Sequence, residues 1–268
     1  MKIAVCVKQV PDSWAEKKMS ADGRLDRAGV DAVLNDLDEY AVEAALSLVE
    51  ASSPTGEAGE GSGHSITVIS MGPDRASEAL RKALSMGVDD AILICDEALA
   101  GSDALATSKV LAEAIRKGGY DLVICGTEST DARMSVVPAM LAERLNFAQL
   151  TFAGKLEVTG STVKISRQTD FGVEEMSAEC PAVVSVVEKI NEPRYPSFKG
   201  IMASKKKPLI TQTLGDIGLS ATEVGSQAAW SSVKDSLPRP PRSAGVKVVD
   251  EGNGGEQLVA FLAERKLI

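Results

Sequence analysis

The chain has 268 residues, of which 44% are hydrophobic and 25% charged, the composition of a globular protein with room for one or two domains. A net charge of −9, with only five Phe, three Tyr and two Trp, argues against a nucleic-acid partner, and a single histidine argues against a metal site. No apolar run approaches the ~20 residues of a membrane span, and the N-terminal MKIAVCVKQV is charged too early for a secretory signal. We therefore expect a cytoplasmic protein without direct membrane insertion.

Apolar runs alternate with helical patterns through the first two thirds of the chain. Four runs have the continuous apolar character of strands buried on both faces: residues 3–7, 65–71, 91–95 and 122–125. Helical periodicity covers three segments: residues 35–49, 74–86 and 103–117. The first of these helices begins with Asn35 as N-cap and Asp38 three residues on, an acidic variant of a capping box. The alternation predicts an α/β fold with a doubly wound, mostly parallel sheet.

The pattern changes after residue 149. Short strands predicted at 156–158, 163–167 and 181–187 have no helices between them, so we expect a small antiparallel hairpin region beside the main sheet. The low-complexity segment 51–63 predicts a mobile loop. Residues 212–242 hold few apolar side chains and several prolines, so this extended C-terminal arm should be disordered or lie on a partner chain, before a short closing helix.

Ligands of open α/β sheets lie beyond the carboxyl ends of the strands, which directs attention to the segment after the run 122–125. Gly126 would let the backbone approach a ligand, and the hydroxyls of Ser129, Thr130 and Ser135 would face a phosphate together with the N–H groups of the next helix. A capped loop without a ligand would contain the same residues. Because the chain has neither a Walker loop nor G-x-G-x-x-G, nucleotide binding stays open at this point.

Eight segments, in order across nearly the whole chain, resemble the β subunit of electron transfer flavoprotein. They are VCVKQVPD, LNDLDEYAVEAAL, SMGPDRASEALRKALSMGVDDA, GTESTDARMS, IxRxxDxG, CPAVVSV, NEPRYPSFKGIMASKKK and PPRSAGVKV. The seventh has no generic structural reason to recur. The chain departs from the family in a longer segment 51–63, in Phe171 and Met176 of the hairpin signature, and in the tail 219–236.

The resemblance implies a non-catalytic electron carrier. The β subunit would bind structural AMP and help to hold the FAD of an α subunit. The heterodimer would accept electrons from acyl-CoA and other dehydrogenases, as in fatty acid β-oxidation, and pass them to the respiratory chain through a quinone oxidoreductase. Family members that bifurcate electrons carry a second FAD in place of AMP, with a loop rich in Gly and Asp where this chain has Ala-Arg-Met. We therefore favour AMP.

Two further alternatives remain, both as stand-alone proteins that bind adenine nucleotides. One is an enzyme such as an adenylylating ligase, but the chain shows no phosphate-activating motif. The other is a stress-type regulator, which would not explain the segment 191–207 or the long arm.

The resemblance also assigns site residues. The AMP site would comprise Cys6, Asn35, Asp36, Leu37, Asp38, Met71, Val123, Gly126, Thr127, Glu128, Ser129, Thr130, Asp131, Ala132, Arg133, Met134, Ser135, Val136 and Val137.

A second set of residues would contact the dehydrogenase. In this family a bulky apolar residue in the corresponding loop inserts into a pocket of the dehydrogenase and anchors the loop there. In this chain the residue at that position is Phe198, and several cations surround it in the sequence. The loop would use Arg194, Tyr195, Phe198, Lys199, Lys205, Lys206 and Lys207. We thus expect a nucleotide-binding domain over 1–190, a partner recognition loop over 191–207, and an arm over 208–268 that packs on the α subunit.

Overall fold

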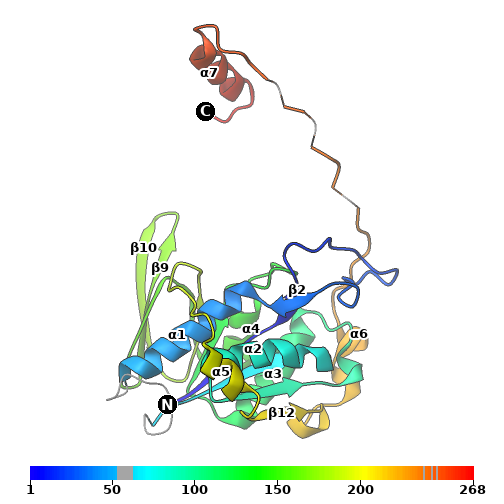
Figure 1. The fold of residues 1–268 in the computed structure, drawn as a ribbon, viewed down its shortest axis with the longest axis vertical. Helices are drawn as coiled ribbons and strands as arrows, with labels where there is room; N and C mark the ends of the chain where they lie inside the picture. Colours follow the sequence, from blue (N-terminus) through cyan, green and yellow to red (C-terminus); the bar gives the residue numbers. More distant parts are fainter. Residues whose placement is uncertain (53–62, 238, 243, 246) are drawn as a thin grey trace. The chain divides into compact units, whose positions relative to one another are not determined.

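The structure, a computed structural model, describes residues 1–52, 63–237, 239–242, 244–245 and 247–268 (Figure 1). These residues form two compact units, 1–234 and 235–268. Most of the segment predicted as a mobile loop, residues 53–62, lies outside the described residues. Within the described part of the chain, no helix has the length and apolar character needed to cross a membrane.

A parallel sheet of seven strands organises the first unit. Its order is β12-β5-β4-β1-β6-β11-β7, and every neighbouring pair is parallel. The strands are β1 (Lys2–Cys6), β4 (Ser65–Met71), β5 (Asp90–Ile94), β6 (Leu122–Gly126), β7 (Ala148–Ala153), β11 (Ala182–Val186) and β12 (Leu209–Gln212). The doubly wound α/β fold predicted from the alternating pattern is confirmed, with the four predicted runs at its centre.

Alternate side chains of the central strands enter two hydrophobic cores, one on each face of the sheet. Ile3 and Val5 of β1 belong to the first core, whereas Ala4 between them belongs to the second. The first core includes residues of α1 and α2, and the second includes residues of α3 and α4. These helices are α1 (Asp36–Ser52), α2 (Ser77–Met86), α3 (Ala104–Gly118) and α4 (Val137–Leu145).

Two small antiparallel sheets complete the body. One is the ribbon of β2 (Gln9–Pro11) and β3 (Ala32–Leu34), and the other has the order β10-β9-β8. The latter comprises β8 (Lys155–Thr159), β9 (Thr162–Thr169) and β10 (Gly172–Glu179), which confirms the predicted hairpin region. The placement of the run 181–187 in that region is wrong. As β11 it lies between β6 and β7 in the main sheet, fully buried, which explains why its residues do not alternate in polarity.

The segment that follows α5 (Phe198–Ser204) packs against the first unit, to which it belongs. β12 pairs with β5, and Leu214, Ile217 and Val224 are buried in the second core. The first part of the segment 212–242 therefore packs on its own chain, because three spaced apolar residues suffice to attach a mainly polar segment. Short helical turns connect these contacts: η3 (Gly215–Ile217), η4 (Ala221–Glu223) and α6 (Gly225–Ala228). The second unit contains α7 (Gly254–Glu264).

Candidate functional site

The sheet reverses its winding at β1, which pairs with β4 on one side and β6 on the other. Such a switch point opens a crevice at the carboxyl ends of the two strands, where open α/β sheets bind ligands. The residues at that edge are Cys6 of β1 and, in register with it, Cys125 of β6. The start of α1 and the segment 126–137 follow these strand ends, so the fold itself brings the two main parts of the expected AMP site together.

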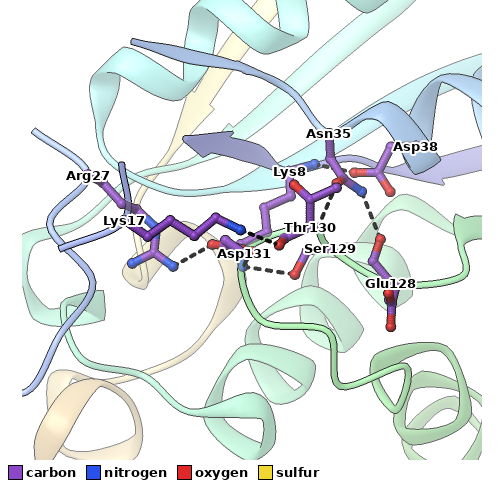
Figure 2. Close-up of polar contacts among 9 residues, drawn as sticks. All are labelled: Lys8, Lys17, Arg27, Asn35, Asp38, Glu128, Ser129, Thr130 and Asp131. Atoms are coloured by element: carbon purple, nitrogen blue, oxygen red, sulfur yellow. Dashed lines mark hydrogen bonds and ion pairs between the residues drawn. The ribbon is translucent and has the colours of Figure 1, made fainter. Parts of the chain in front are cut away.

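Asn35 joins these two parts by hydrogen bonds (Figure 2). Its side-chain amide donates to the carbonyl of Glu128 at 2.9 Å and accepts from the N–H of Thr130 at 3.0 Å. Asp38, meanwhile, accepts from the backbone N–H of Lys8 at 2.8 Å. The predicted capping box is therefore wrong, because both side chains bind neighbouring elements instead of closing the first turn of α1.

Gly126 lies where β6 comes close to the first turn of α1. A Cβ at this position would lie 2.5 Å from Oδ1 of Asp38 and 2.7 Å from the carbonyl oxygen of Leu37. A side chain cannot be accommodated there, because the contact atoms are the buried carboxylate of Asp38 and a backbone carbonyl of the first turn of α1. The close approach of β6 to α1 thus gives a structural reason for glycine at this position, and the expected approach of its backbone to a ligand stays a prediction.

Three cations converge on the segment 129–131, as Figure 2 shows. Lys8 Nζ lies 2.8 Å from Oδ1 of Asp131, and Arg27 lies 2.5 Å from its Oδ2. Lys17 donates to the carbonyl of Thr130 at 3.2 Å. Although burial opposes ionisation, Lys8, together with Arg27 and Ser129, holds the pKa of Asp131 at about 2. Asp131 therefore fixes the loop as an anion, and it is committed to the chain's own residues.

The following residues form a cradle that fits a phosphate group. Arg133 and Ser135 have φ of 50° and 56°, values that L-residues rarely adopt, on either side of Met134. Such alternation turns successive N–H groups toward one side, and α4 begins directly afterwards at Val137. In the described part of the chain, no backbone carbonyl or side chain accepts from the N–H groups of Met134, Ser135 or Val136. These donors are what a phosphate would bind.

The other residues assigned to the AMP site divide between edge and core. Cys6 and Met71 lie half-buried at the ends of neighbouring strands, and Asp36 and Leu37 open α1, all near the switch point. Thr127 donates to the carbonyl of Val186 at 2.6 Å and holds β6 to β11. Val123 is fully buried within the second core, so its side chain does not reach the edge.

Asp38 makes this edge sensitive to pH. Burial raises its pKa from 3.8 to about 7, although the neighbouring side chain of Asn35 and the backbone N–H of Lys8 both lower it, and nearby Asp131 adds to the rise. Because the folded pKa exceeds the unfolded one, the contribution of Asp38 to stability is complete below pH 3.8 and is lost as pH rises through about 7.

Asp38→Asn keeps an acceptor for Lys8 but cannot ionise. We expect the variant to gain stability relative to the wild type by about 1.4 kcal/mol per pH unit between these values. Melting curves recorded between pH 4 and 8 test this, and parallel pH profiles would contradict it.

The expected recognition loop is fixed to α1 at its beginning. Asn191 donates to the carbonyl of Tyr40 at 3.1 Å. Arg194 binds two carboxylates of α1, with Nε 2.7 Å from Glu43 and one terminal nitrogen 2.6 Å from Glu50. Hydrogen bonds to these carboxylates raise the pKa of Arg194 further above its ordinary value. Arg194 is therefore engaged within the chain, and its guanidinium orients the loop.

Beyond this attachment the loop presents apolar side chains to solvent. Tyr195 is 93% exposed and Phe198 is 79% exposed, at the start of α5. Phe198 thus does not fold back into the core, the alternative that a loop phenylalanine always has. Lys199, Lys205 and Lys206 are exposed near it, whereas Lys207 donates to the carbonyls of Gly87 and Val88 at the end of α2.

Several residues that shape both surfaces carry no signal in the sequence. Lys17 and Arg27 lie in a segment without periodicity, and their respective partners, Thr130 and Asp131, are more than 100 positions away. Lys8 is the exception, because its place directly after a predicted strand marks it as an edge residue. Glu43 and Glu50 have ordinary helix spacing, and only the fold places them against Arg194.

Comparison with known proteins identifies the family of the chain. Residues 22–217 match the family model described as "Electron transfer flavoprotein domain". The chain is 48% identical over 268 residues to electron transfer flavoprotein subunit beta of Mycobacterium tuberculosis, with 99% of each chain covered. It is 49% identical over 268 residues to the same subunit of Mycobacterium leprae, again with 99% of each covered. It is 34% identical over 273 residues to the caffeyl-CoA reductase-Etf complex subunit CarD of Acetobacterium woodii, with 100% of each covered.

Proposed function

The chain belongs to the electron transfer flavoprotein family as a β subunit, a carrier subunit and not an enzyme, and we propose that it binds structural AMP and works in a heterodimer with an α subunit that carries FAD. In this proposal the heterodimer is cytoplasmic, takes electrons from acyl-CoA and other dehydrogenases, and passes them towards the respiratory chain through a quinone oxidoreductase. The observation that carries it is the pairing of a phosphate cradle at the switch point with an exposed, anchored recognition loop.

The nucleotide half rests on the segment 126–137. The N–H groups of Met134, Ser135 and Val136 would hold the phosphate, the N-terminus of α4 would add a favourable field, and Arg133 could supply a bidentate contact. AMP bound there stabilises the fold and offers no chemistry of its own. Ala132, Arg133 and Met134 favour AMP over a second FAD, and mass spectrometry of the ligand released from the purified protein distinguishes the two.

We expect the double variant Asn35→Ala, Ser135→Ala to lose AMP. The first change removes both hydrogen bonds that hold the loop to α1, and the second removes the hydroxyl that donates to Glu128 at 2.8 Å. At a hundredfold excess of AMP over its Kd, the wild type should gain about 2.7 kcal/mol of stability, and the variant should gain much less. Nucleotide content after gel filtration and melting with added AMP measure both effects. If neither quantity changes, the nucleotide lies elsewhere.

The partner half rests on surfaces that a lone chain leaves uncovered. In the second unit, Leu258 and Val259 of α7 are 57% and 56% exposed, and Leu267 after it is 66% exposed. An apolar helix of this kind is stable when a partner covers it, and we assign that role to the α subunit.

Co-expression with an α subunit tests the heterodimer. We expect a yellow complex with FAD, whereas the chain expressed alone should bind no FAD tightly and should be cut readily by protease after residue 234. Stoichiometric FAD on the chain expressed alone would contradict the proposal that the α subunit carries the FAD.

A further inference from the structure

An open hollow lies between α2 and α5, the helix within the recognition loop 191–207. Its volume is about 500 Å³, and its lining residues are Arg81, Lys82, Ser85, Ile201, Ser204 and Lys205. Three of these six residues are cations and none is acidic, in a chain whose net charge is −9. Apolar atoms line most of the hollow, and Ile201, 45% exposed, stands at its edge.

The two walls of the hollow are held together firmly. Arg81 of α2 donates to the carbonyls of Ser204 and Lys207 at 2.6 and 2.8 Å. Gly200 lets α5 approach closely, because a Cβ there would lie 2.4 Å from the carbonyl oxygen of Ser85. The hollow is therefore preformed, and a partner that enters it does not have to order α5 first.

The cations on the walls are only partly used by the chain itself. Arg81 is occupied by its two carbonyls, and Lys82 has a single long contact, 3.9 Å to Glu39. Within the described residues, Lys205 makes no ion pair. Lys82 and Lys205 thus both line the hollow, Lys205 without an ion pair among the described residues and Lys82 with only the long contact to Glu39.

We propose that this hollow receives an aspartate or glutamate side chain of the docking dehydrogenase, so that α2 is a second docking element next to the Phe198 anchor. The inference rests on the proposed function, since it concerns the same partner. The partner chemistry follows from charge complementarity: a carboxylate would pair with Lys82 and Lys205, and its aliphatic stem would contact Ile201. A partner with an acidic residue near its Phe198 pocket would be selected over one with a basic residue there.

Two double variants with the same charge change test the hollow in the purified heterodimer. One is Lys82→Glu with Lys205→Glu, which reverses the charges inside. The other is Lys199→Glu with Lys206→Glu, which reverses two charges of the loop that do not line the hollow. The readout is the rate of flavin reduction by an acyl-CoA dehydrogenase at several salt concentrations, with the melting temperature as a check on folding.

We expect the hollow variant to lose at least tenfold in rate, and the loss to persist at high salt because the docked partner would cover the contact and shield it from solvent. The loop variant should lose rate chiefly at low salt, where long-range steering matters. Equal losses that vanish together at high salt, or no loss in the hollow variant, would overturn the inference. A Phe198→Ala heterodimer distinguishes a failure of the hollow inference from a failure of the proposed docking through the recognition loop. If this variant is also reduced at the wild-type rate, the proposed docking itself fails.

Discussion

Replacing Phe198 with alanine should lower the rate at which a dehydrogenase reduces the heterodimer by about 30-fold or more. Phe198 is 79% exposed at the start of a helix that Arg81, Gly200 and Lys207 hold against α2, so its side chain is offered in a fixed position. A large apolar side chain presented in this way is typical of a hot spot, whose truncation costs about 2 kcal/mol or more. Such a loss corresponds to the expected change in rate.

The matched control for this variant is Phe171→Ala. Phe171 is 101% exposed at the turn between β9 and β10, outside the recognition loop. Both variants should fold, keep AMP and be reduced by dithionite as the wild type is, because neither residue packs in a core. A Phe198→Ala protein that accepts electrons from its dehydrogenase at the wild-type rate would exclude the loop as the docking site.

Replacing Arg194 with leucine should destabilise the protein by about 2 to 3 kcal/mol. Four side-chain hydrogen bonds to Glu43 and Glu50 disappear, and the carboxylate of Glu43, only 9% exposed, is left without its counter-ion. The cost is below that of a fully buried pair because Arg194 itself is 34% exposed. The freed loop should also dock less well, although Phe198 is intact.

The pH dependence of this variant has a definite sign. In the wild type, burial would raise the pKa of Glu43, but Arg194 prevails and lowers it, so the stabilisation is present at neutral pH and is lost as acid protonates Glu43. Without Arg194, burial opposes the ionisation of Glu43 and only the hydrogen bond from Ser47 favours it, so the variant should regain stability relative to the wild type as the pH falls. Urea unfolding at pH 4.5 and 7.5 measures the difference, and an equal, small loss at both pH values would contradict it.

The order of strands and helices was accessible from the sequence because each buried strand is a continuous apolar run and each helix has one apolar face. The run 181–187 was misplaced since residues alone do not say which strands it pairs with, and the intervening β8, β9 and β10 suggested a hairpin neighbour. Strand β7 was not predicted at all. Its sequence AQLTFA mixes polar and apolar residues, and only pairing with β11 reveals it as part of the main sheet.

The features of the candidate site that could be predicted were likewise those with a local sequence pattern, and those that depend on tertiary contacts could not. The strand-to-helix junction 126–137 could be found from the sheet rule alone, whereas the amide of Asn35 could not be told apart from a helix cap. Its binding to Glu128 and Thr130 depends on contacts more than 90 positions apart in the chain. The sequence around Gly126 likewise could not show that α1 lies too close for a side chain at this position.

The most direct measurement follows the flavin of the purified heterodimer when an acyl-CoA, with or without its dehydrogenase, is added. As a carrier subunit without substrate turnover, the protein should leave acyl-CoA unchanged by itself. The FAD of the heterodimer should be bleached only when the dehydrogenase is present. It should be reoxidised when a quinone oxidoreductase is then added. Oxidation of acyl-CoA by the heterodimer alone, or no reduction by any acyl-CoA dehydrogenase tested from the same cell, would contradict the proposed role.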